Sequence, residues 1–498
     1  MTDRIGSEEE RRVVAAAPRR LHVGGEWRDA QGGAVLAVED PSTGAVLCEV
    51  ADATPADGRA ALDAAAAAFP AFAATAPRER GELLRRAYEL TVARREELAL
   101  LMTLEMGKPL AEARGEVDYA AAFLRWYAEE AVRADGRFAR EEHGRGHVLT
   151  MCRPVGPCLF VTPWNFPLAM GARKLAPALA AGCTIVVKPA QQTPLSMLAL
   201  TRIMIEAGLP DGVLNAIPTS SAGDVVGPLM ADPRLRKLSF TGSTEIGRRL
   251  MAQASEQLQR VSLELGGNAP FLVFDDADLD RAVDGALLAK LRNGGEACTS
   301  ANRFLVHERI APAFAERFAA RMAAVRVGRG TDPGVQVGPL IDERQRDAVG
   351  ALVQDAVDRG ADVALGGERL PGAGWFYKPT VLADVPADAR LLREEIFGPV
   401  APVVTFSDDE QAIAAANDTE YGLAAYVFTQ DVDRAFDAIE RLDVGMVGFN
   451  QGIVSNAGAP FGGIKHSGFG REGGPEGLRE YLDTKYVALA PGRRRAAA

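Results

Sequence analysis

The run Cys158-Leu159-Phe160-Val161-Thr162 is apolar, short and rich in strand-forming residues, and it stops at Pro163. A helical stretch from Ala169 to Ala181 follows, and a second run, Cys183-Thr184-Ile185-Val186-Val187, ends at Lys188. The same alternation continues to residue 240. Short runs without polar alternation, separated by helices, indicate parallel strands buried on both faces. We therefore predict an α/β fold with a doubly wound parallel sheet, whose ligands bind beyond the carboxyl ends of the strands.

Upstream of this alternation, the chain divides into four stretches of different pattern. Residues 1–20 are charged and rich in alanine, and we expect them to be disordered. Residues 22–50 carry strand and turn signals, and residues 57–133 have a helical pattern. Residues 137–153 are polar and broken by glycines, which suits a hairpin that leaves the domain.

Composition and charge narrow the class of protein. A chain of 498 residues is too long for one core, so two or three domains are expected. The net charge of −11 argues against nucleic acid or an anionic membrane as the main partner. No apolar run of about 18 residues and no signal-peptide core is present. The five cysteines form no C-x-x-C pair, so we expect a cytoplasmic protein.

A metal site is not expected. Only His143 and His147 have a spacing that could serve a metal, and Gly144-Arg145-Gly146 between them would break a helix. We interpret this segment as the tip of a hairpin.

The stretch Arg292-Asn293-Gly294-Gly295-Glu296-Ala297-Cys298-Thr299-Ser300 presents a cysteine after two glycines, which let the backbone approach a ligand closely. Upstream, Glu264 supplies a carboxylate that could activate water once a substrate is bound to the thiol. A lone cysteine is more often a small buried hydrophobic residue. Because Asn165 and Arg292 are also placed to serve it, we predict that Cys298 is a nucleophile and Glu264 its general base.

The turn Phe240-Thr241-Gly242-Ser243-Thr244-Glu245-Ile246-Gly247 leads into a helix whose N-terminus could hold a phosphate. It lacks the G-x-G-x-x-G pattern, and by itself it is equally a capped helix start. Lys188, at a strand end, could reach a phosphate or a ribose hydroxyl. Together these features favour a dinucleotide cofactor.

Several motifs in order resemble those of the NAD(P)-dependent aldehyde dehydrogenases. They are Pro163-Trp164-Asn165-Phe166-Pro167, Phe240 to Gly247, Glu264-Leu265-Gly266-Gly267, Cys298, Glu394-Glu395-Ile396-Phe397-Gly398-Pro399 and Pro460-Phe461-Gly462-Gly463-Ile464-Lys465. The resemblance extends from about His22 to Val487. It implies a dinucleotide-binding domain (21–134 and 154–263), a catalytic domain (264–459), a connecting segment (460–478) and a small β oligomerisation element (135–153 and 479–498), in a homodimer or homotetramer.

The resemblance also implies a mechanism. The Cys298 thiolate attacks the aldehyde, the Asn165 amide and the Cys298 N–H stabilise the oxyanion, and hydride passes to NAD or NADP. Glu264 then activates the water that hydrolyses the thioester. The residues expected to contact the cofactor are Thr162, Pro163, Trp164, Lys188, Gln191, Gly242, Ser243, Glu395 and Phe397. Lys174 and Glu472 match positions of a proton relay, although a pair of surface charges is equally consistent with the sequence. A turn or cap is the alternative for Asn165.

The expected substrate is an aldehyde with a distant carboxylate. Arg173, expected on one helix with Asn165, and Arg292 are two guanidinium groups that could hold such an anion. With Ser455, they match the carboxylate site of the succinate-semialdehyde branch, so we predict oxidation of succinate semialdehyde to succinate. Glutarate semialdehyde stays an alternative, as does an uncharged or amino aldehyde with the arginines merely structural. Either arginine could also serve a surface ion pair. Relatives that transfer the acyl group to coenzyme A generally lack the glutamate that matches Glu264, so its presence favours hydrolysis to the free acid. A catalytically silent binding protein would not need this glutamate, which argues against that third alternative.

Gln191 bears on the choice of cofactor. NAD-preferring relatives often have a glutamate there, which repels a 2′-phosphate, and a neutral amide removes that repulsion. We therefore expect NADP to be accepted.

Overall fold

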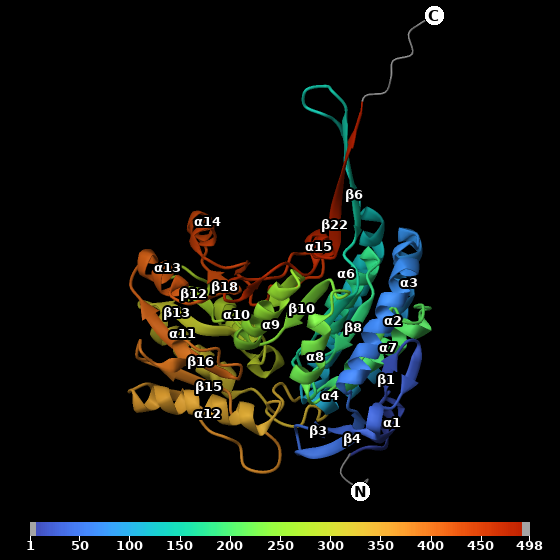
Figure 1. Ribbon diagram of the computed structural model, residues 1–498. Coiled ribbons are helices and arrows are strands. Elements are labelled where there is room, and N and C mark those ends of the chain that lie inside the picture. Colours follow the sequence, from blue (N-terminus) through green and yellow to red (C-terminus); the bar gives the residue numbers. More distant parts are fainter. Residues whose placement is uncertain (1–5, 491–498) are drawn as a thin grey trace, which may run out of the picture.

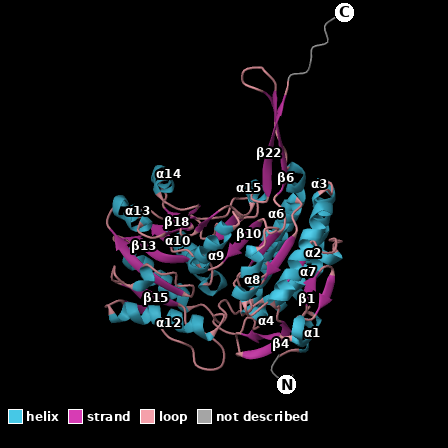
Figure 2. Cartoon of the chain, viewed as in Figure 1, coloured by secondary structure: helices cyan, strands magenta, loops and turns pink. Residues whose placement is uncertain are grey.

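The computed structural model describes residues 6–490 and contains two large sheets surrounded by helices (Figures 1 and 2). The two sheets lie side by side, and a narrow arm of strands projects from the body beside one of them (Figure 1). Within the described residues, no single helix is long and apolar enough to cross a membrane, and α2 (Pro55–Ala73) and α3 (Pro77–Ala93) meet this test only as a pair bent by 120°.

The first sheet contains the strands that the alternation predicts. Its order is β2-β1-β9-β8-β7-β10-β11-β21, and the strands from β9 to β11 are parallel. The bounds are β1 (Leu21–Val23), β2 (Glu26–Arg28), β7 (Cys158–Val161), β8 (Ile185–Lys188), β9 (Leu214–Ala216), β10 (Lys237–Thr241), β11 (Arg260–Glu264) and β21 (Gly468–Phe469). The chain runs from β7 outward to β9 and then returns to β10 on the other side. This reversal of strand order places a ligand site at the carboxyl ends of β7 and β10.

Helices cover both faces of this sheet, because its strands are apolar on both sides. Leu159 and Leu238 pack against α2, α8 and α9, whereas Phe160 and Val187 pack against the layer from α3 to α7. The further helices are α4 (Arg95–Met106), α5 (Leu110–Glu130), α6 (Ala169–Ala181), α7 (Pro194–Glu206), α8 (Ala222–Ala231) and α9 (Thr244–Glu256). The doubly wound α/β prediction is confirmed.

The second sheet has the order β14-β15-β16-β13-β12-β18-β19 and is parallel except at β14. Phe271 and Phe304 pack against α10 and α11, while Leu272 and Phe274 pack against α13 and α14. Its elements are β12 (Ala269–Val273), α10 (Leu279–Leu291), β13 (Ala301–His307), α11 (Ala311–Ala323), α12 (Glu343–Asp358), β14 (Asp362–Leu365), β15 (Thr380–Ala383), β16 (Val400–Phe406), α13 (Asp409–Asn417), β18 (Ala424–Phe428), α14 (Val432–Arg441) and β19 (Met446–Phe449).

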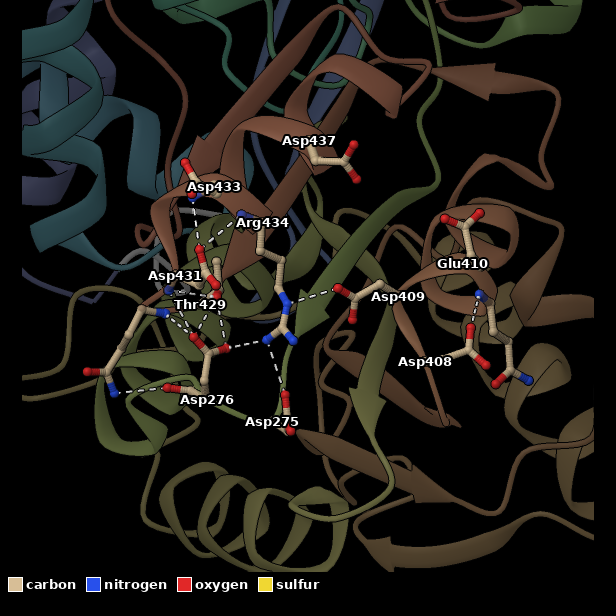
Figure 3. A network of polar contacts seen from close by, with 12 residues as sticks. Asp275, Asp276, Asp408, Asp409, Glu410, Thr429, Asp431, Asp433, Arg434 and Asp437 are labelled. Carbon is tan, nitrogen blue, oxygen red and sulfur yellow. Dashed lines mark hydrogen bonds and ion pairs between the residues drawn. The ribbon is translucent and has the colours of Figure 1, made fainter.

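A network of ion pairs ties the outer helices of the second sheet to its strand ends (Figure 3). Arg434 of α14 contacts Asp275 at 3.1 Å, Asp276 at 2.8 Å and Asp409 at 2.9 Å. Asp276 also accepts a hydrogen bond from the backbone N–H of Asp431, at the start of α14. Because Arg434 and backbone N–H groups bind these carboxylates, we interpret the network as structural.

The arm is a three-stranded antiparallel sheet of order β22-β6-β5, made of β5 (Phe138–Arg140), β6 (His147–Pro154) and β22 (Leu482–Leu489). The turn around His143 is a hairpin tip, as the glycines predict. Glu141, Glu142 and His143 lie close together there on the surface, and Glu141 accepts hydrogen bonds from the backbone of the turn itself.

The expected disorder of residues 1–20 is wrong for most of that segment. Residues 8–16 form α1 (Glu8–Ala16), which begins with a capping box between Ser7 and Glu10. Val13 and Val14 are buried in the core of the first sheet, and Arg329 pairs with Glu10 at 3.0 Å. The charged, alanine-rich composition of this segment gave no sign that Val13 and Val14 pack against the core. Residues 1–5 and 491–498, which include the end of the expected oligomerisation element, lie outside the described residues.

Short elements complete the described chain. They are β3 (Val35–Asp40) paired with β4 (Ala45–Ala51), β17 (Tyr421–Gly422) paired with β20 (Ile464–Lys465), α15 (Gly474–Arg479), and 3-10 turns at Gln31–Gly33, Ala131–Arg133, Arg292–Gly295 and Arg390–Leu392.

Candidate active site

A cavity of about 400 Å³ lies between the carboxyl ends of β7, β10 and β11 in the first sheet and the amino ends of β12, β13 and β16 in the second. It brings together eleven of the residues that the sequence singles out: Pro163, Trp164, Asn165, Arg173, Gly242, Ser243, Arg292, Cys298, Glu395, Phe397 and Ser455. These residues come from both sheets and from segments far apart in the chain. Tyr119, Phe166 and Phe461, which the motif analysis did not assign to the site, form aromatic walls.

The loop before Cys298 depends on its glycines. Asn293, Gly294 and Gly295 all have positive φ angles, of 55°, 63° and 84°. A side chain at Gly295 would place its Cβ 2.2 Å from the carbonyl oxygen of Gly398, so only glycine fits there. The loop thereby presents Cys298, which is half-buried, to the cavity.

The Cys298 thiol is neutral in this environment. Burial raises its pKa to about 12, and the nearby Glu395 and Glu264 reinforce that shift, while Arg173 and Arg292 oppose it. Because the thiolate is the nucleophile, the reaction requires that a proton leave Cys298 when the substrate binds.

Asn165 lies in a turn before α6, so the expectation that it shares a helix with Arg173 is wrong. Pro167 restricts the residue before it to extended conformations, and α6 begins only at Ala169. The side-chain amide of Asn165 donates to the carbonyl of Glu296 at 3.0 Å, and its Oδ1 accepts from the N–H of Phe166 at 3.1 Å. Asn165 thus forms part of the turn and also lines the cavity next to the Cys298 loop.

A buried ion pair that the sequence analysis missed holds this turn. Lys108 donates to the carbonyl of Asn165 at 2.7 Å and pairs with Glu116 at 2.5 Å. Glu116 also accepts from the first N–H groups of α6, at Leu168 and Ala169. No local motif marks this pair, because its partners meet only in the folded chain.

Glu264 lies at the end of β11 and is buried, with no partner for its Oε2 among the described residues. Burial, and then the negative charge of Glu472, raise the pKa of Glu264 well above its usual range. A Cβ at Gly462 would lie 2.9 Å from Oε1, so this glycine makes room for the carboxyl group. Burial therefore disfavours the charged form of Glu264.

Arg173 and Arg292 both face the cavity. Arg173 is 1% exposed, lies 4.0 Å from the centre of the Phe461 ring and has no partner for its Nη2 among the described residues. Arg292 donates to Ser455 Oγ at 3.1 Å and lies over the ring of Phe166. A surface ion pair is therefore wrong for Arg173, whose ion pair with Glu472 is buried, and none involves Arg292 among the described residues.

Lys174 and Glu472 are buried, which rules out the alternative of two surface charges. Lys174 Nζ donates to Glu472 at 2.5 Å and to Ser239 Oγ at 3.0 Å, and Arg173 Nε donates to the other oxygen of Glu472. Although burial opposes ionisation, these two cations lower the pKa of Glu472 to about 2.

Several of the residues expected to contact the cofactor lie at the carboxyl ends of β7, β8 and β10, where the strand order of the first sheet reverses. Thr162 is buried at the end of β7, and Lys188 is buried at the end of β8, where burial lowers its pKa to about 8. Among the described residues, Lys188 has no side-chain partner, and neither has the buried Thr241 Oγ1. Ser243 caps α9 through the N–H of Ile246. These unpaired polar groups fit a ligand with hydroxyl or phosphate groups.

Two further cofactor candidates lie on the side of the second sheet. Glu395 accepts from the N–H of Gly267 at 3.0 Å, and burial raises its pKa to about 7. Phe397 packs edge-on against Trp164, with ring centres 5.3 Å apart. Gln191 lies elsewhere, in a separate exposed hollow that it shares with Arg344.

The comparisons with known proteins agree with this site. Residues 27–487 match the model of the aldehyde dehydrogenase family, and the chain belongs to this family of oxidoreductases. Within it, the chain is 59% identical over 445 residues to a succinate-semialdehyde dehydrogenase of Paenarthrobacter nicotinovorans, covering 89% of this chain and 99% of the relative. It is 48% identical to a glutarate-semialdehyde dehydrogenase of Pseudomonas putida, with 95% and 98% covered. The crystal structure of an NADP dependent enzyme of E. coli matches with a TM-score of 0.94 at 48% identity, over 95% of this chain and 98% of that one. The family resemblance and the fold class are thereby confirmed.

Proposed function

We propose that the protein oxidises an aldehyde that carries a distant carboxylate, with succinate semialdehyde as the preferred substrate and succinate as the product. This proposal rests on two guanidinium groups, those of Arg173 and Arg292, which line the same cavity as Cys298. Arg173 is buried in its wall. Two fixed cations between aromatic walls suit a carboxylate, because charge-assisted hydrogen bonds in a dry site are strong. Ser455 adds a hydroxyl beside Arg292.

In the proposed reaction, the Cys298 thiol releases its proton to solvent and its sulfur bonds to the aldehyde carbon. The side-chain amide of Asn165 and the N–H of Cys298 then donate to the oxygen that becomes negative. A bound NADP or NAD supplies the hydride acceptor for the oxidation to a thioester. Glu264 accepts a proton from water, whose oxygen adds to the thioester carbon, and the carbon–sulfur bond breaks to release the acid and the Cys298 thiolate.

The proposed cofactor contacts follow from the unpaired groups at the strand ends. Lys188, Thr241 and the N-terminus of α9 would hold hydroxyl and phosphate groups, while Glu395 and Phe397 would orient the reactive ring. Gln191 carries no charge that would repel a 2′-phosphate, and Arg344 lines the same hollow. These features favour NADP as an accepted cofactor, as does the similarity to the NADP dependent enzyme of E. coli.

Glutarate semialdehyde is a second candidate substrate, since the chain is also similar to a glutarate-semialdehyde dehydrogenase. It is one methylene longer, which a hydrophobic site discriminates by only about 1–3 kcal/mol. The same two arginines would bind its carboxylate.

The decisive experiment compares kcat/KM for succinate semialdehyde, glutarate semialdehyde and butanal, which lacks the carboxylate. We expect Arg292→Ala to raise KM for the semialdehydes by at least about tenfold, or 1.4 kcal/mol, with little change for butanal. Arg317→Ala, an exposed arginine on α11, is the matched control and should leave all three unchanged. Equal losses for butanal and for the semialdehydes would reject a carboxylate-binding function for Arg292.

A further inference from the structure

Asn293 is a buried residue of the Cys298 loop to which the proposed reaction assigns no role. It is 2% exposed and has a positive φ of 55°, a conformation that asparagine adopts more readily than most residues. Its backbone N–H donates to Glu112 Oε2, which holds the start of the loop against α5. The side-chain amide makes a second and separate set of contacts.

Two backbone carbonyl groups share the amide of Asn293. Its Nδ2 donates to the carbonyl oxygen of Asn165 at 3.0 Å and to that of Glu296 at 2.9 Å. A side-chain amide has two N–H groups, so these contacts use both. The first carbonyl belongs to the turn before α6, and the second lies two residues before Cys298. One side chain thus joins two segments that are 131 positions apart in the chain.

The carbonyl of Glu296 also holds the side chain of Asn165. One N–H of the Asn165 amide donates to it at 3.0 Å, and Oδ1 of Asn165 accepts from Phe166. A carbonyl oxygen has two lone pairs, and the two asparagines occupy both. The second N–H of Asn165 has no acceptor among the described residues, and this side chain lines the cavity beside Cys298. It is this N–H that the proposed reaction assigns to the oxyanion.

We propose that Asn293 is the positioning residue of the oxyanion site, because its amide fixes the free N–H of Asn165 in place relative to Cys298. This inference rests on the proposed reaction, in which that N–H and the backbone N–H of Cys298 bind the oxygen that becomes negative. Such donors are effective because they are in place before the charge develops, so a small displacement weakens them. Asn293 does not itself line the cavity, and it therefore acts through Asn165.

The surrounding contacts predict that Asn293 matters more for rate than for folding. Without its side chain, the carbonyl of Asn165 would keep Lys108 Nζ as a donor at 2.7 Å, and the carbonyl of Glu296 would keep the Asn165 amide. The Oδ1 of Asn293 has no partner among the described residues, so its removal leaves no donor unpaired. Because no buried polar group would lose its last partner, we expect little loss of stability.

The variant Asn293→Gly isolates the side chain, because glycine adopts a positive φ and keeps the N–H that binds Glu112. Acylation of Cys298 by p-nitrophenyl acetate is the test reaction, since attack on this ester forms an oxyanion and needs neither the cofactor nor a carboxylate site. Stopped-flow absorbance of the released p-nitrophenolate measures its rate. We expect Asn293→Gly to slow acylation at least about tenfold, which is part of the roughly 10²–10³ that a whole oxyanion donor contributes. An unchanged rate would overturn the proposal.

Asn417→Gly is the matched control. Asn417 ends α13, and its amide donates to the carbonyl of Arg441 in α14 at 2.9 Å, so this variant also removes an amide that joins two separate segments. Asn417 does not line the cavity, and the variant should be acylated at the wild-type rate. An equal slowing in Asn417→Gly would assign the effect to general loosening of the protein and would reject the proposal.

A double-mutant cycle shows whether Asn293 acts through Asn165. In an Asn165→Ala background we expect Asn293→Gly to change the rate of acylation by less than about twofold, because the donor that it positions is already absent. The same loss in both backgrounds would mean that Asn293 acts elsewhere, which would contradict the inference. Wild-type acylation in Asn165→Ala alone would instead reject the proposed reaction, in which Asn165 binds the oxyanion.

Alkylation by iodoacetamide separates the position of the amide from that of the thiol. The sulfur of Cys298 bonds to carbon and iodide leaves, so no oxyanion forms. Mass spectrometry of the peptide that contains Cys298 follows this reaction, which should proceed in Asn293→Gly at the wild-type rate. A loss equal to that in acylation would show a displaced thiol and overturn the proposal. Asn293→Asp, which sets oxygen atoms against both carbonyls, should be acylated at least as slowly as Asn293→Gly, and wild-type acylation there would show that no donor is needed.

Discussion

At the scale of single residues, Glu264 combines two properties that oppose each other. Its enclosed position excludes bulk water from the thioester, but burial also raises its pKa and so disfavours the ionised carboxylate. A general base must be ionised to act, so the neighbouring charges decide when Glu264 works.

Replacing Glu264 tests its place in the reaction. We expect Glu264→Gln to form the Cys298 thioester but to hydrolyse it about 10²–10⁴ times more slowly. Rapid-mixing absorbance of the reduced cofactor, combined with mass spectrometry of the protein, measures both steps. Glu256→Gln, an exposed carboxylate at the far end of α9, should behave as wild type. A normal rate of hydrolysis in Glu264→Gln would show that another group activates water.

The charge at position 191 is expected to set the preference between the cofactors. Gln191→Glu places a carboxylate in the hollow that Arg344 also lines, and it should lower kcat/KM for NADP relative to NAD at least about tenfold, or 1.4 kcal/mol. Gln192→Glu, the next residue in the same hollow, is the matched control. Steady-state kinetics with both cofactors checks this. A wild-type enzyme that already favours NAD tenfold would contradict the acceptance of NADP.

At the scale of elements, the start of α6 is held from a distance. Glu116 of α5 receives the first N–H groups of α6, and Lys108 joins Glu116 to the carbonyl of Asn165. The turn that contains Asn165 is thus held in part by an ion pair between Lys108, in the loop before α5, and Glu116 of α5. Breaking such a pair leaves an uncompensated charge in the core.

Lys108→Met should therefore destabilise the protein by about 3–5 kcal/mol and also reduce kcat, because Asn165 loses its support. Denaturant unfolding and steady-state kinetics measure these effects. The double variant Lys108→Met with Glu116→Gln should recover part of the stability, since it removes the unpaired charge. Arg114→Met, an exposed residue of the same helix as Glu116, is the control for loss of a surface ion pair. An unchanged melting curve for Lys108→Met would refute the structural importance of the pair.

At the scale of the whole molecule, the arm projects from the body and carries exposed apolar side chains (Figure 1). Phe138, Met151 and Leu489 share one face of it and are 65%, 51% and 38% exposed. Apolar side chains on a projecting sheet favour contact with a second copy of the chain. We propose that this face contributes to the interface of a homodimer or homotetramer.

Met151→Glu should weaken this assembly, because it would bury an unpaired charge in the interface. Size-exclusion chromatography with light scattering should show a smaller species at the same protein concentration. Thr484→Glu, on the opposite face of the arm, is the matched control and should leave the mass unchanged. An unaltered mass for Met151→Glu would exclude this face from the interface.

Much of the first sheet was predictable, because uninterrupted apolar runs such as residues 158–162 and 183–187 indicate buried parallel strands wherever they occur. Residues 292–300 were recognisable in the same way, since the order of glycines and cysteine is local. The error at residues 1–20 has the opposite cause. Val13 and Val14 are too few to form a pattern, and only the neighbouring core shows that they are buried.

The sequence by itself determined the parallel sheet, the family and the candidate nucleophile, base and amide, because each depends on a short stretch of residues and its chemistry. The tertiary structure decided how these groups behave. Arg173 and Glu472 are 299 positions apart in the chain, and no local pattern relates them. Their contact exists only because the fold closes around both, and in that low-dielectric interior the charge of Arg173 lowers the pKa of Glu472.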